Sequence, residues 1–397
     1  MNKKSLIERN SNERIQSLDL LRGFALLGIL IMNIISFSDI GIAYINPTVG
    51  AGLEGYNGIV HAFSYLFADM RFMSIFSILF GAGIMIFSNN ALQKGLHSGK
   101  YHYRRMFLLL LFGFIHAYLI WLGDILVMYA ICGSIVFLMR NWKIKTLFIV
   151  GSIFFTIPII LSLSTFLFVP AEGLQEIFKF WTPTKDEINI EILAYRGSYI
   201  EQMPTRIAGA IEIQTLIFLT EQSWRILSMM ILGMILYKKG ILSANKENTF
   251  YRRLFINGML LGITLSAIGL YRAYAYNWNG IWYMTMGHYY NYIASLSVAL
   301  GYIGLIMLWS KTTFMVNWQL RLKAVGRLAF TNYILTSIIC TLIFYGHGLG
   351  LFASLDRLQQ WSIILIVWSI LLYISPIILK KYNKGPLEFI WRKFTYL

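Results

Sequence analysis

Long stretches of apolar residues, separated by short polar connections, constrain this chain more than any other feature of its sequence. They cover residues 17–38, 70–89, 104–121, 125–139, 146–169, 206–237, 253–273, 288–309, 326–345 and 360–379. A helix needs about 20 predominantly apolar residues to cross a bilayer. Only 13% of the residues are charged, against about 25% in an ordinary soluble domain. We therefore predict an all-α polytopic membrane protein: a bundle of about ten spans that forms one integral membrane domain over residues 1–397.

Basic residues fall in alternate loops. Lys and Arg cluster at residues 3–14, 94–105, 140–145, 238–253, 311–327 and 380–393, whereas loops 39–69, 122–124, 274–287 and 346–359 are poor in both. Loops rich in Lys and Arg face the cytoplasm. This pattern predicts a multi-pass protein of the cell membrane with both termini cytoplasmic. The net charge of +16 is spread over these loops, so a nucleic-acid partner is not expected.

Two segments leave alternatives open. The exterior loop 170–205 is the longest, and it mixes charges of both signs with Trp181 and Tyr199. It is interpreted either as a small amphipathic lid or as a solvated connector. The apolar stretch 206–237 is overlong and is interrupted by Glu221-Gln222-Ser223. It is interpreted either as one span or as an interfacial helix followed by a crossing one.

His116 and Asp124 are the strongest candidates for chemistry. His116 lies in the outer half of the third span, and Asp124 follows a glycine turn at the start of the fourth. Histidine exchanges protons near neutral pH, and a carboxylate can hold its ring in one tautomer. We predict that His116 is a general base oriented by Asp124. The alternative is a structural hydrogen bond between helices.

Further polar residues lie at the ends of the spans. Asp19 and Arg22 are three residues apart at the cytoplasmic end of the first span and can pair; Arg22 and Asn33, eleven apart, share a helix face. Arg71 lies at the outer end of the second span, against the positive-inside trend. It is expected to bind an anionic group, with a local pair with Asp69 as the alternative.

The start of the ninth span carries a polar cluster that includes Arg327 and Asn332. It is level with Asp19 and Arg22 and would line an inner vestibule, unless its side chains only form hydrogen bonds between helices. His288, next to tyrosines 289, 290 and 292, is interpreted as part of an aromatic belt. No spacing of His, Cys, Asp and Glu fits a metal site, so no metal is predicted.

Several motifs recur in one order along nearly the whole chain. They are Leu18-Asp19-x-x-Arg22-Gly23 with Asn33-Ile34, Arg71-Phe72 before Phe80-Gly81-Ala82-Gly83, Gly113-Phe114-Ile115-His116 with Gly123-Asp124-Ile125-Leu126, Gly326-Arg327-x-Ala329-x-Thr331-Asn332-Tyr333, Phe344-Tyr345 with Gly348-Leu349-Gly350, and Gly385-Pro386-Leu387-Glu388-x-x-Trp391-Arg392. This set resembles the YeiB-like family of bacterial multi-span membrane proteins, with Phe389 in place of the family's Trp.

The first span and outer loop of that family resemble the transmembrane acyltransferase superfamily. There, a similar Asp-x-x-Arg-Gly helix precedes a loop that bears the catalytic histidine. The resemblance implies His61 as the matching residue here. Its spacing to the next span differs from the superfamily pattern, so His61 is held in reserve behind His116.

These features together suggest a membrane-embedded acyltransferase. Acyl-CoA would enter from the cytoplasm beside Asp19, Arg22 and Arg327. An envelope glycan or lipid acceptor would meet it near His116, positioned by Arg71 and Asn33. The alternatives are a transporter or exporter of a small or lipidic envelope molecule, and a membrane partner without catalysis. Membrane lipids are expected partners, and a homo-oligomer is compatible with the pattern.

Overall fold

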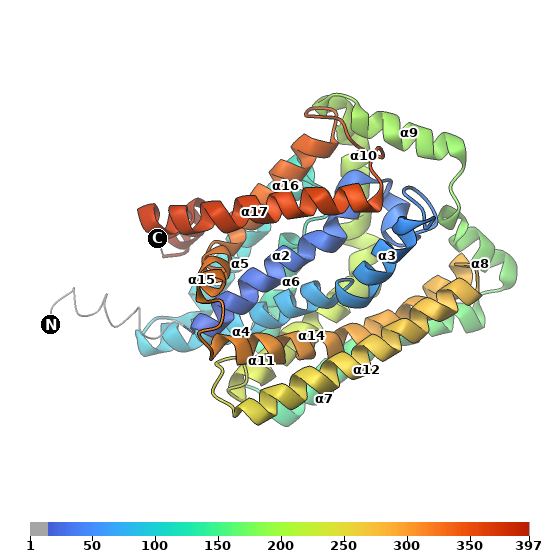
Figure 1. The fold of residues 1–397 in the computed structure, drawn as a ribbon. Coiled ribbons are helices and arrows are strands. Elements are labelled where there is room, and N and C mark those ends of the chain that lie inside the picture. Colours follow the sequence, from blue (N-terminus) through green and yellow to red (C-terminus); the bar gives the residue numbers. More distant parts are fainter. Residues whose placement is uncertain (1–14, 397) are drawn as a thin grey trace.

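The computed structural model describes residues 15–396, which form helices joined by short connections and contain no strand (Figure 1). The elements are α2 (Gln16–Ser38), η1 (Gly41–Tyr44), α3 (Tyr56–Phe67), α4 (Arg71–Gln93), α5 (Ser98–Ile115), η2 (His116–Ile120), α6 (Leu126–Leu138), α7 (Ile144–Phe168), α8 (Ala171–Ile177), η3 (Lys179–Trp181), α9 (Lys185–Arg196), α10 (Tyr199–Glu212), η4 (Ile213–Gln222), α11 (Ser223–Lys238), α12 (Asn248–Ala275), α13 (Gly280–Trp282), η5 (Tyr283–Gly287), α14 (His288–Ser310), α15 (Val316–Arg327), α16 (Ala329–Phe344), α17 (Arg357–Tyr382) and α18 (Pro386–Tyr396). The predicted all-α class is confirmed.

Seven helices in the described range are long and apolar enough to cross a membrane, or eight if α15 and α16, bent by 85°, form one span. The predicted count of about ten is therefore not confirmed. The predicted count exceeds the observed one because two of the predicted stretches do not form a spanning helix. Residues 125–139 form α6, whose 13 residues span only about 20 Å. Residues 206–237 form part of α10, then η4 and α11, where a π-helical segment interrupts the α-helix.

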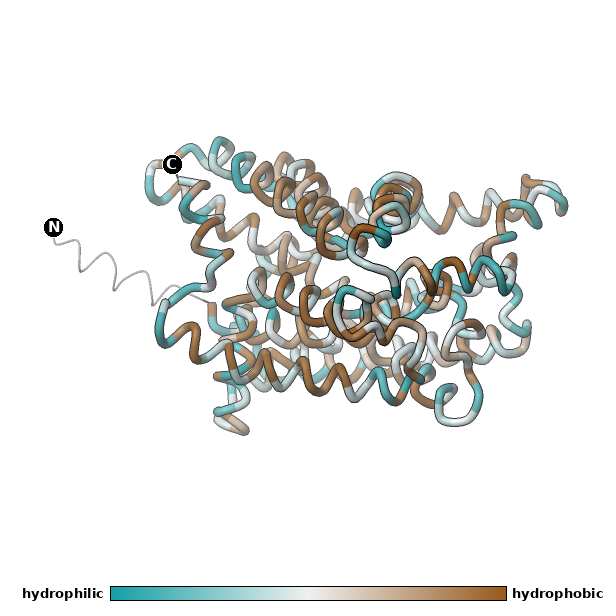
Figure 2. The backbone as a smooth tube through the Cα atoms, turned by 90° about the horizontal axis from the view of Figure 1, so that it is seen from above, coloured by the Kyte–Doolittle hydropathy of each residue, from teal (hydrophilic) through white to brown (hydrophobic). Residues whose placement is uncertain are grey.

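The bundle has two distinct ends. The beginning of α2 and the C-terminus lie at one end, here called the terminal end, whereas α8, α9 and α10 lie at the other, here called the α9 end (Figure 1). Hydrophobic residues run along the middle of the helices, and hydrophilic residues gather towards the ends (Figure 2). Which end faces the cytoplasm remains a prediction.

The basic loops meet at the terminal end, as their alternation requires. The Lys238 ammonium donates to the Trp142 carbonyl at 2.7 Å, and Lys311 donates to Asn248 Oδ1 at 3.1 Å. Loops far apart in sequence therefore touch there. The basic cluster at residues 3–14 lies outside the described residues.

Glycines set the closest helix crossings. A Cβ at Gly81 of α4 would overlap the Met230 carbonyl of α11, and one at Gly233 of α11 would overlap the Ile78 carbonyl of α4. Small residues allow such close approach between membrane helices. Gly23, the glycine of the Asp-x-x-Arg-Gly motif, plays the same part where α2 crosses α15.

Residues 170–205 are largely helical and fold onto the α9 end. α9 and α10 each begin with a capping box, formed by Thr184 with Glu187 and by Ser198 with Glu201. Such caps satisfy the free N–H groups of the first helical turn. Glu191 of α9 accepts a hydrogen bond from the Gly41 N–H at 2.8 Å, which ties this segment to the loop after α2. Its action as a lid remains a prediction.

Candidate functional site

His116 lies where the regular part of α5 ends. The chain continues from His116 to Ile120 as a π-helical turn, and then becomes extended at Trp121. π-helical turns are rare and are often found at functional sites. The irregular stretch 121–125, extended at Trp121, carries Asp124 and leads into α6. Irregular backbone at membrane depth is tolerated where protein encloses it, and Trp121 and Asp124 are both buried.

His116 joins two hydrogen-bonding partners. Its Nδ1 is 2.8 Å from Asp124 Oδ1, and its Nε2 is 2.9 Å from Ser337 Oγ on α16. Asp124 Oδ2 also accepts a hydrogen bond from the Val127 N–H at 2.8 Å. When Nδ1 donates to Asp124, Nε2 can accept from the Ser337 hydroxyl, which also lies 3.3 Å from the Tyr333 carbonyl as a second acceptor. The predicted pair is present, whereas its catalytic role remains a prediction.

Asp124, His116 and Ser337 stand in the order of a serine-nucleophile triad: carboxylate, imidazole, hydroxyl. The exposed fractions of His116 and Asp124 are 0%, and that of Ser337 is 1%. The Tyr333 ring lies 4.9 Å from the His116 ring, and the Trp121 ring lies 6.1 Å from it. The three polar groups are thus enclosed by aromatic side chains.

The reserve candidate His61 lies elsewhere, in the wall of a cavity between α2, α3 and η5. The cavity has a volume of about 20 Å³, which is room for about one water molecule, and its wall consists of Met32, Ile35, Ala43, Tyr44, Ile45, Pro47, His61, Ser64, Tyr65, Asp69 and Tyr283. His61 Nε2 has no hydrogen-bond partner among the described residues. His61 thus has space beside it, and His116 has the orienting carboxylate.

Arg71 is buried and bonded to neighbouring protein groups. Its guanidinium donates to Asn291 Oδ1 at 2.6 Å, to the Asp69 carbonyl oxygen and to Ser266 Oγ. Asn291 in turn donates to the Asp69 carboxylate at 2.7 Å. The local pairing that was the alternative for Arg71 is therefore present, extended through Asn291.

The polar residues at the terminal end form a separate group. Asp19 and Arg22 make the predicted ion pair, with 3.1 Å between Arg22 Nη1 and Asp19 Oδ1. Arg327 donates to the Asn383 carbonyl at 3.3 Å. None of these three takes part in the hydrogen bonds of His116.

Asn332 is bonded to groups other than His116. The Asn332 amide donates to the Val325 carbonyl at 3.1 Å and to Ser375 Oγ at 2.9 Å, and its side chain is buried. It therefore makes the hydrogen bonds between helices that were the alternative to a vestibule. Asn33 is half-buried on α2.

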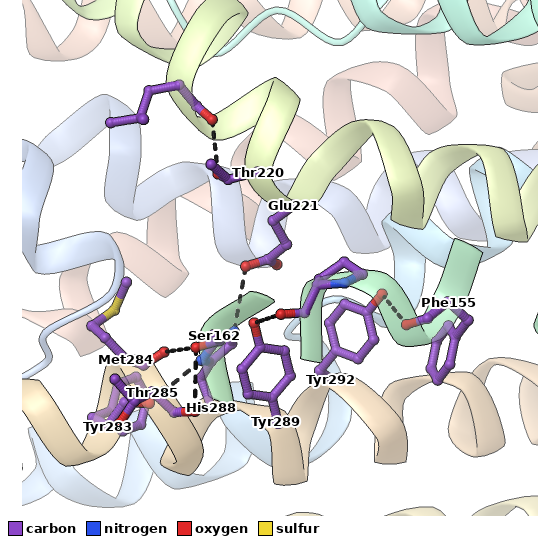
Figure 3. A network of polar contacts seen from close by, with 12 residues as sticks. Phe155, Ser162, Thr220, Glu221, Tyr283, Met284, Thr285, His288, Tyr289 and Tyr292 are labelled. Carbon is purple, nitrogen blue, oxygen red and sulfur yellow. Dashed lines mark hydrogen bonds and ion pairs between the residues drawn. The ribbon is translucent and has the colours of Figure 1, made fainter. Parts of the chain in front are cut away.

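His288 is not part of an aromatic belt, and that prediction is wrong. It follows η5 directly, and its Nε2 lies 3.3 Å from Glu221 Oε2, near the end of η4 (Figure 3). Tyr289 donates to the Pro158 carbonyl at 2.8 Å, and Tyr292 is fully buried. A belt lies at the lipid-facing interface, whereas these side chains point into the bundle.

The sequence offers no local signal for Ser337, because serine is common in membrane helices and its partner is 221 residues away. In the sequence, Glu221 is evident only as an interruption of the apolar stretch 206–237. Within residues 15–396, no three His, Cys, Asp or Glu side chains gather closely enough to hold a metal ion.

The fold and these buried polar groups define a polytopic helical membrane protein with ionisable residues inside its bundle. Residues 236–397 match the family described as "Protein of unknown function (DUF418)". The chain is 30% identical to the uncharacterized protein YeiB of Escherichia coli K12, over 96% of each chain. It is also 30% identical to the uncharacterized protein YxaH of Bacillus subtilis 168, over 98% of this chain and 95% of that one. The chain belongs to the YeiB-like family, as its motifs predict.

Proposed function

We propose that the protein is a membrane-embedded acyltransferase that uses Ser337, His116 and Asp124. The acyl group would come from acyl-CoA on the cytoplasmic side and pass to a glycan or lipid of the cell envelope. The hydrogen-bonded series from Asp124 through His116 to Ser337 is the observation that carries this proposal. A hydroxyl that donates to an oriented imidazole is the arrangement that activates serine for attack on an acyl carbon.

The first half-reaction loads the serine. Ser337 Oγ attacks the thioester carbonyl carbon while its proton passes to His116 Nε2. The carbon–sulfur bond then breaks, and the leaving thiolate takes that proton from His116. Asp124 stays ionised and keeps the His116 ring in the tautomer whose Nε2 can accept a proton. The products are an ester on Ser337 and free CoA.

The second half-reaction unloads the serine. A hydroxyl of the acceptor gives its proton to His116 Nε2 and attacks the ester carbon. The bond to Ser337 Oγ breaks, and that oxygen recovers the proton from His116. In both half-reactions the atoms, protons and charges balance without a metal ion or a redox partner.

Substrate has to reach an enclosed site, so the aromatic wall of Tyr333 and Trp121 must open during the cycle. Some of the sequence predictions keep their roles in this proposal. Arg22 and Arg327, beside Asp19, would attract the phosphates of CoA at the terminal end. Asn33 would position the acceptor, whereas Arg71, buried and bonded to Asn291 and Ser266, has no part in the proposal.

The test uses purified full-length protein and acyl-CoA with a radiolabelled acetyl group. Wild type is expected to acquire label that hydroxylamine removes, as it does from an ester, and Ser337→Ala and His116→Ala are expected to acquire none. Ser77→Ala is the matched control, because Ser77 is another buried serine and bonds to Tyr129 OH at 2.8 Å. Labelling of Ser337→Ala at the wild-type level would overturn the serine step.

The reserve histidine is tested in parallel. His61→Ala is expected to retain labelling and transfer, since no carboxylate of residues 15–396 is hydrogen-bonded to His61. Loss of transfer in His61→Ala, with His116→Ala active, would move the chemistry to the cavity that His61 lines.

A transporter or exporter is the second candidate, and the Glu221–His288 pair favours it. The two residues meet where π-helical segments interrupt two helices. Buried ionisable residues serve proton relays in transporters, and broken helices often mark their binding sites. Proton flux into liposomes without acyl-CoA, lost in Glu221→Gln, would support this function.

A further inference from the structure

Arg206 of α10 is a buried cation with which no described residue pairs. Its exposed fraction is 0%. Its Nε, Nη1 and Nη2 atoms have no hydrogen-bond partner among the described residues, and no carboxylate of residues 15–396 lies within ion-pair distance. A buried charge without a partner is strongly unfavourable.

Other buried arginines of this protein are bonded. Arg225 donates to Ser74 Oγ at 2.9 Å and to Ser295 Oγ at 2.6 Å. Arg357 donates to the carbonyls of Gly52 and Pro47 at 3.0 and 3.2 Å. Arg206 therefore departs from the way this chain otherwise stabilises a buried guanidinium.

The surroundings of Arg206 are polar and also incompletely bonded. Its guanidinium carbon lies 5.2 Å from the Tyr199 ring centre and 5.9 Å from that of Tyr345. These cation–π contacts stabilise the charge but leave its N–H donors unused. Tyr345 OH, Gln202 Oε1 and His347 Nδ1 are likewise buried without partners in the described part of the chain.

These groups form one cluster at the α9 end. Gln202 and Arg206 are one turn apart on α10, so they share a face. The His347 ring lies 5.6 Å from the Tyr199 ring and 5.9 Å from that of Tyr345. Burial and the charge of Arg206 lower the pKa of His347, so this side chain is neutral at physiological pH. Tyr199, whose ring lies against the Arg206 guanidinium, is 37% exposed.

We propose that Arg206 and Tyr345, with Gln202 and His347 beside them, bind a phosphate group. The guanidinium offers five N–H donors in a planar fork, and the Tyr345 hydroxyl offers one more. A phosphate has enough oxygens to accept from both, and it neutralises the charge that the protein leaves unpaired. Gln202 Oε1 would accept from a hydroxyl of the same ligand. The phosphate belongs either to a lipid headgroup or to a free anion.

This site adjoins the predicted catalytic segment but does not depend on acyl transfer. Tyr199 donates to the Leu119 carbonyl at 2.7 Å, which joins the cluster to the π-helical turn that begins at His116. A bound phosphate would hold α10 against that turn. Binding can therefore be measured without any enzymatic assay.

The test measures thermal unfolding of the purified full-length protein with a thiol-reactive dye, which reports exposure of the buried Cys132 and Cys340. Inorganic phosphate is compared with chloride at equal ionic strength, and phosphatidylglycerol with diacylglycerol, which lacks the phosphate, in mixed micelles. The midpoint of wild type is expected to rise by a few degrees with one of the two phosphate probes. A rise with inorganic phosphate identifies a free anion, and a rise with phosphatidylglycerol alone identifies a lipid headgroup.

Variants separate binding from folding. Arg206→Met is expected to unfold at or above the wild-type midpoint without ligand, since it removes an unpaired buried charge, and to show no rise with phosphate. Tyr345→Phe removes only an unpartnered hydroxyl and should bind on the order of tenfold more weakly. Arg272→Gln, which removes a charge bonded to Tyr290 at the same end, should behave as wild type. The proposed phosphate site would be refuted if the unfolding midpoint of wild type did not rise with either phosphate probe, or if it rose equally in Arg206→Met.

Discussion

Replacing Asp124 with Asn tests the buried carboxylate on which the His116 orientation depends. In the native protein, Asp124 accepts hydrogen bonds from His116 Nδ1 and from the Val127 N–H, both at 2.8 Å. An amide of the same shape can accept only one of them, because its NH₂ then faces the other donor. Hydrogen bonds to a charged group contribute about 1.5–3 kcal/mol each, and we expect a loss of that size.

The loss translates into a modest thermal shift. With an unfolding entropy of about 2.1 cal/mol/K per residue, a chain of 397 residues is expected to unfold about 2–4 °C lower. Asp124→Ala leaves both donors without an acceptor and should shift the midpoint further. If the acyltransferase proposal holds, Asp124→Asn should also slow transfer about 10²–10⁴-fold.

The assay uses the two cysteines of the chain, which are both buried and therefore react with a thiol dye only on unfolding. Ser77→Ala, which also removes a buried hydrogen bond, shows how far such a loss alone shifts the midpoint. Wild-type midpoints for both Asp124→Asn and Asp124→Ala would refute the reasoning. They would mean that neither hydrogen bond contributes to the folded state.

Three further predictions concern the fold. Glu388→Ala removes the carboxylate that caps the first turn of α16. It should lower the free energy of unfolding, measured by thermal unfolding, by about 1–2 kcal/mol. Gly81→Val should force α4 from α11 and reduce the monodisperse fraction in size-exclusion chromatography, whereas Gly83→Val, which faces open space, should not. Burial and the charge of Asp39 raise the pKa of Glu191. The stabilisation that protonated Glu191 gives to the contact between α9 and Gly41 is complete below about pH 4.3 and is lost as the pH rises through the raised pKa. Hydrogen exchange of the α9 amides should therefore become faster as the pH rises through that range. Glu191→Gln should remove this pH dependence of hydrogen exchange.

Contacts between residues close in sequence could be predicted, because the local backbone geometry alone brings such residues together. Asp19 and Arg22 are one helical turn apart, and they pair in the structure. His116 and Asp124 are eight residues apart across a short turn, and they also pair. The interruption at Glu221 was visible as well, although its partner His288 was misjudged.

Partners from distant parts of the chain could not be predicted in the same way. Arg71 was expected to bind an external anion, but Asn291, 220 residues further on, supplies an acceptor. Arg206 begins the apolar stretch 206–237, its place in the sequence does not distinguish it from Arg71, and no described group pairs with it. Only the packing of the helices separates these two cases.

The sequence by itself determined the helical membrane class, the alternation of basic loops and the acid–imidazole pair. These follow from the transfer free energy of each segment and from the helical repeat, both of which depend on residues close along the chain. The tertiary structure decided that Ser337 completes the series at His116, that an irregular segment precedes the short helix α6, and that no described residue pairs with Arg206. These depend on how each helix is rotated and which helix it meets, which the chain settles only by packing all of them together.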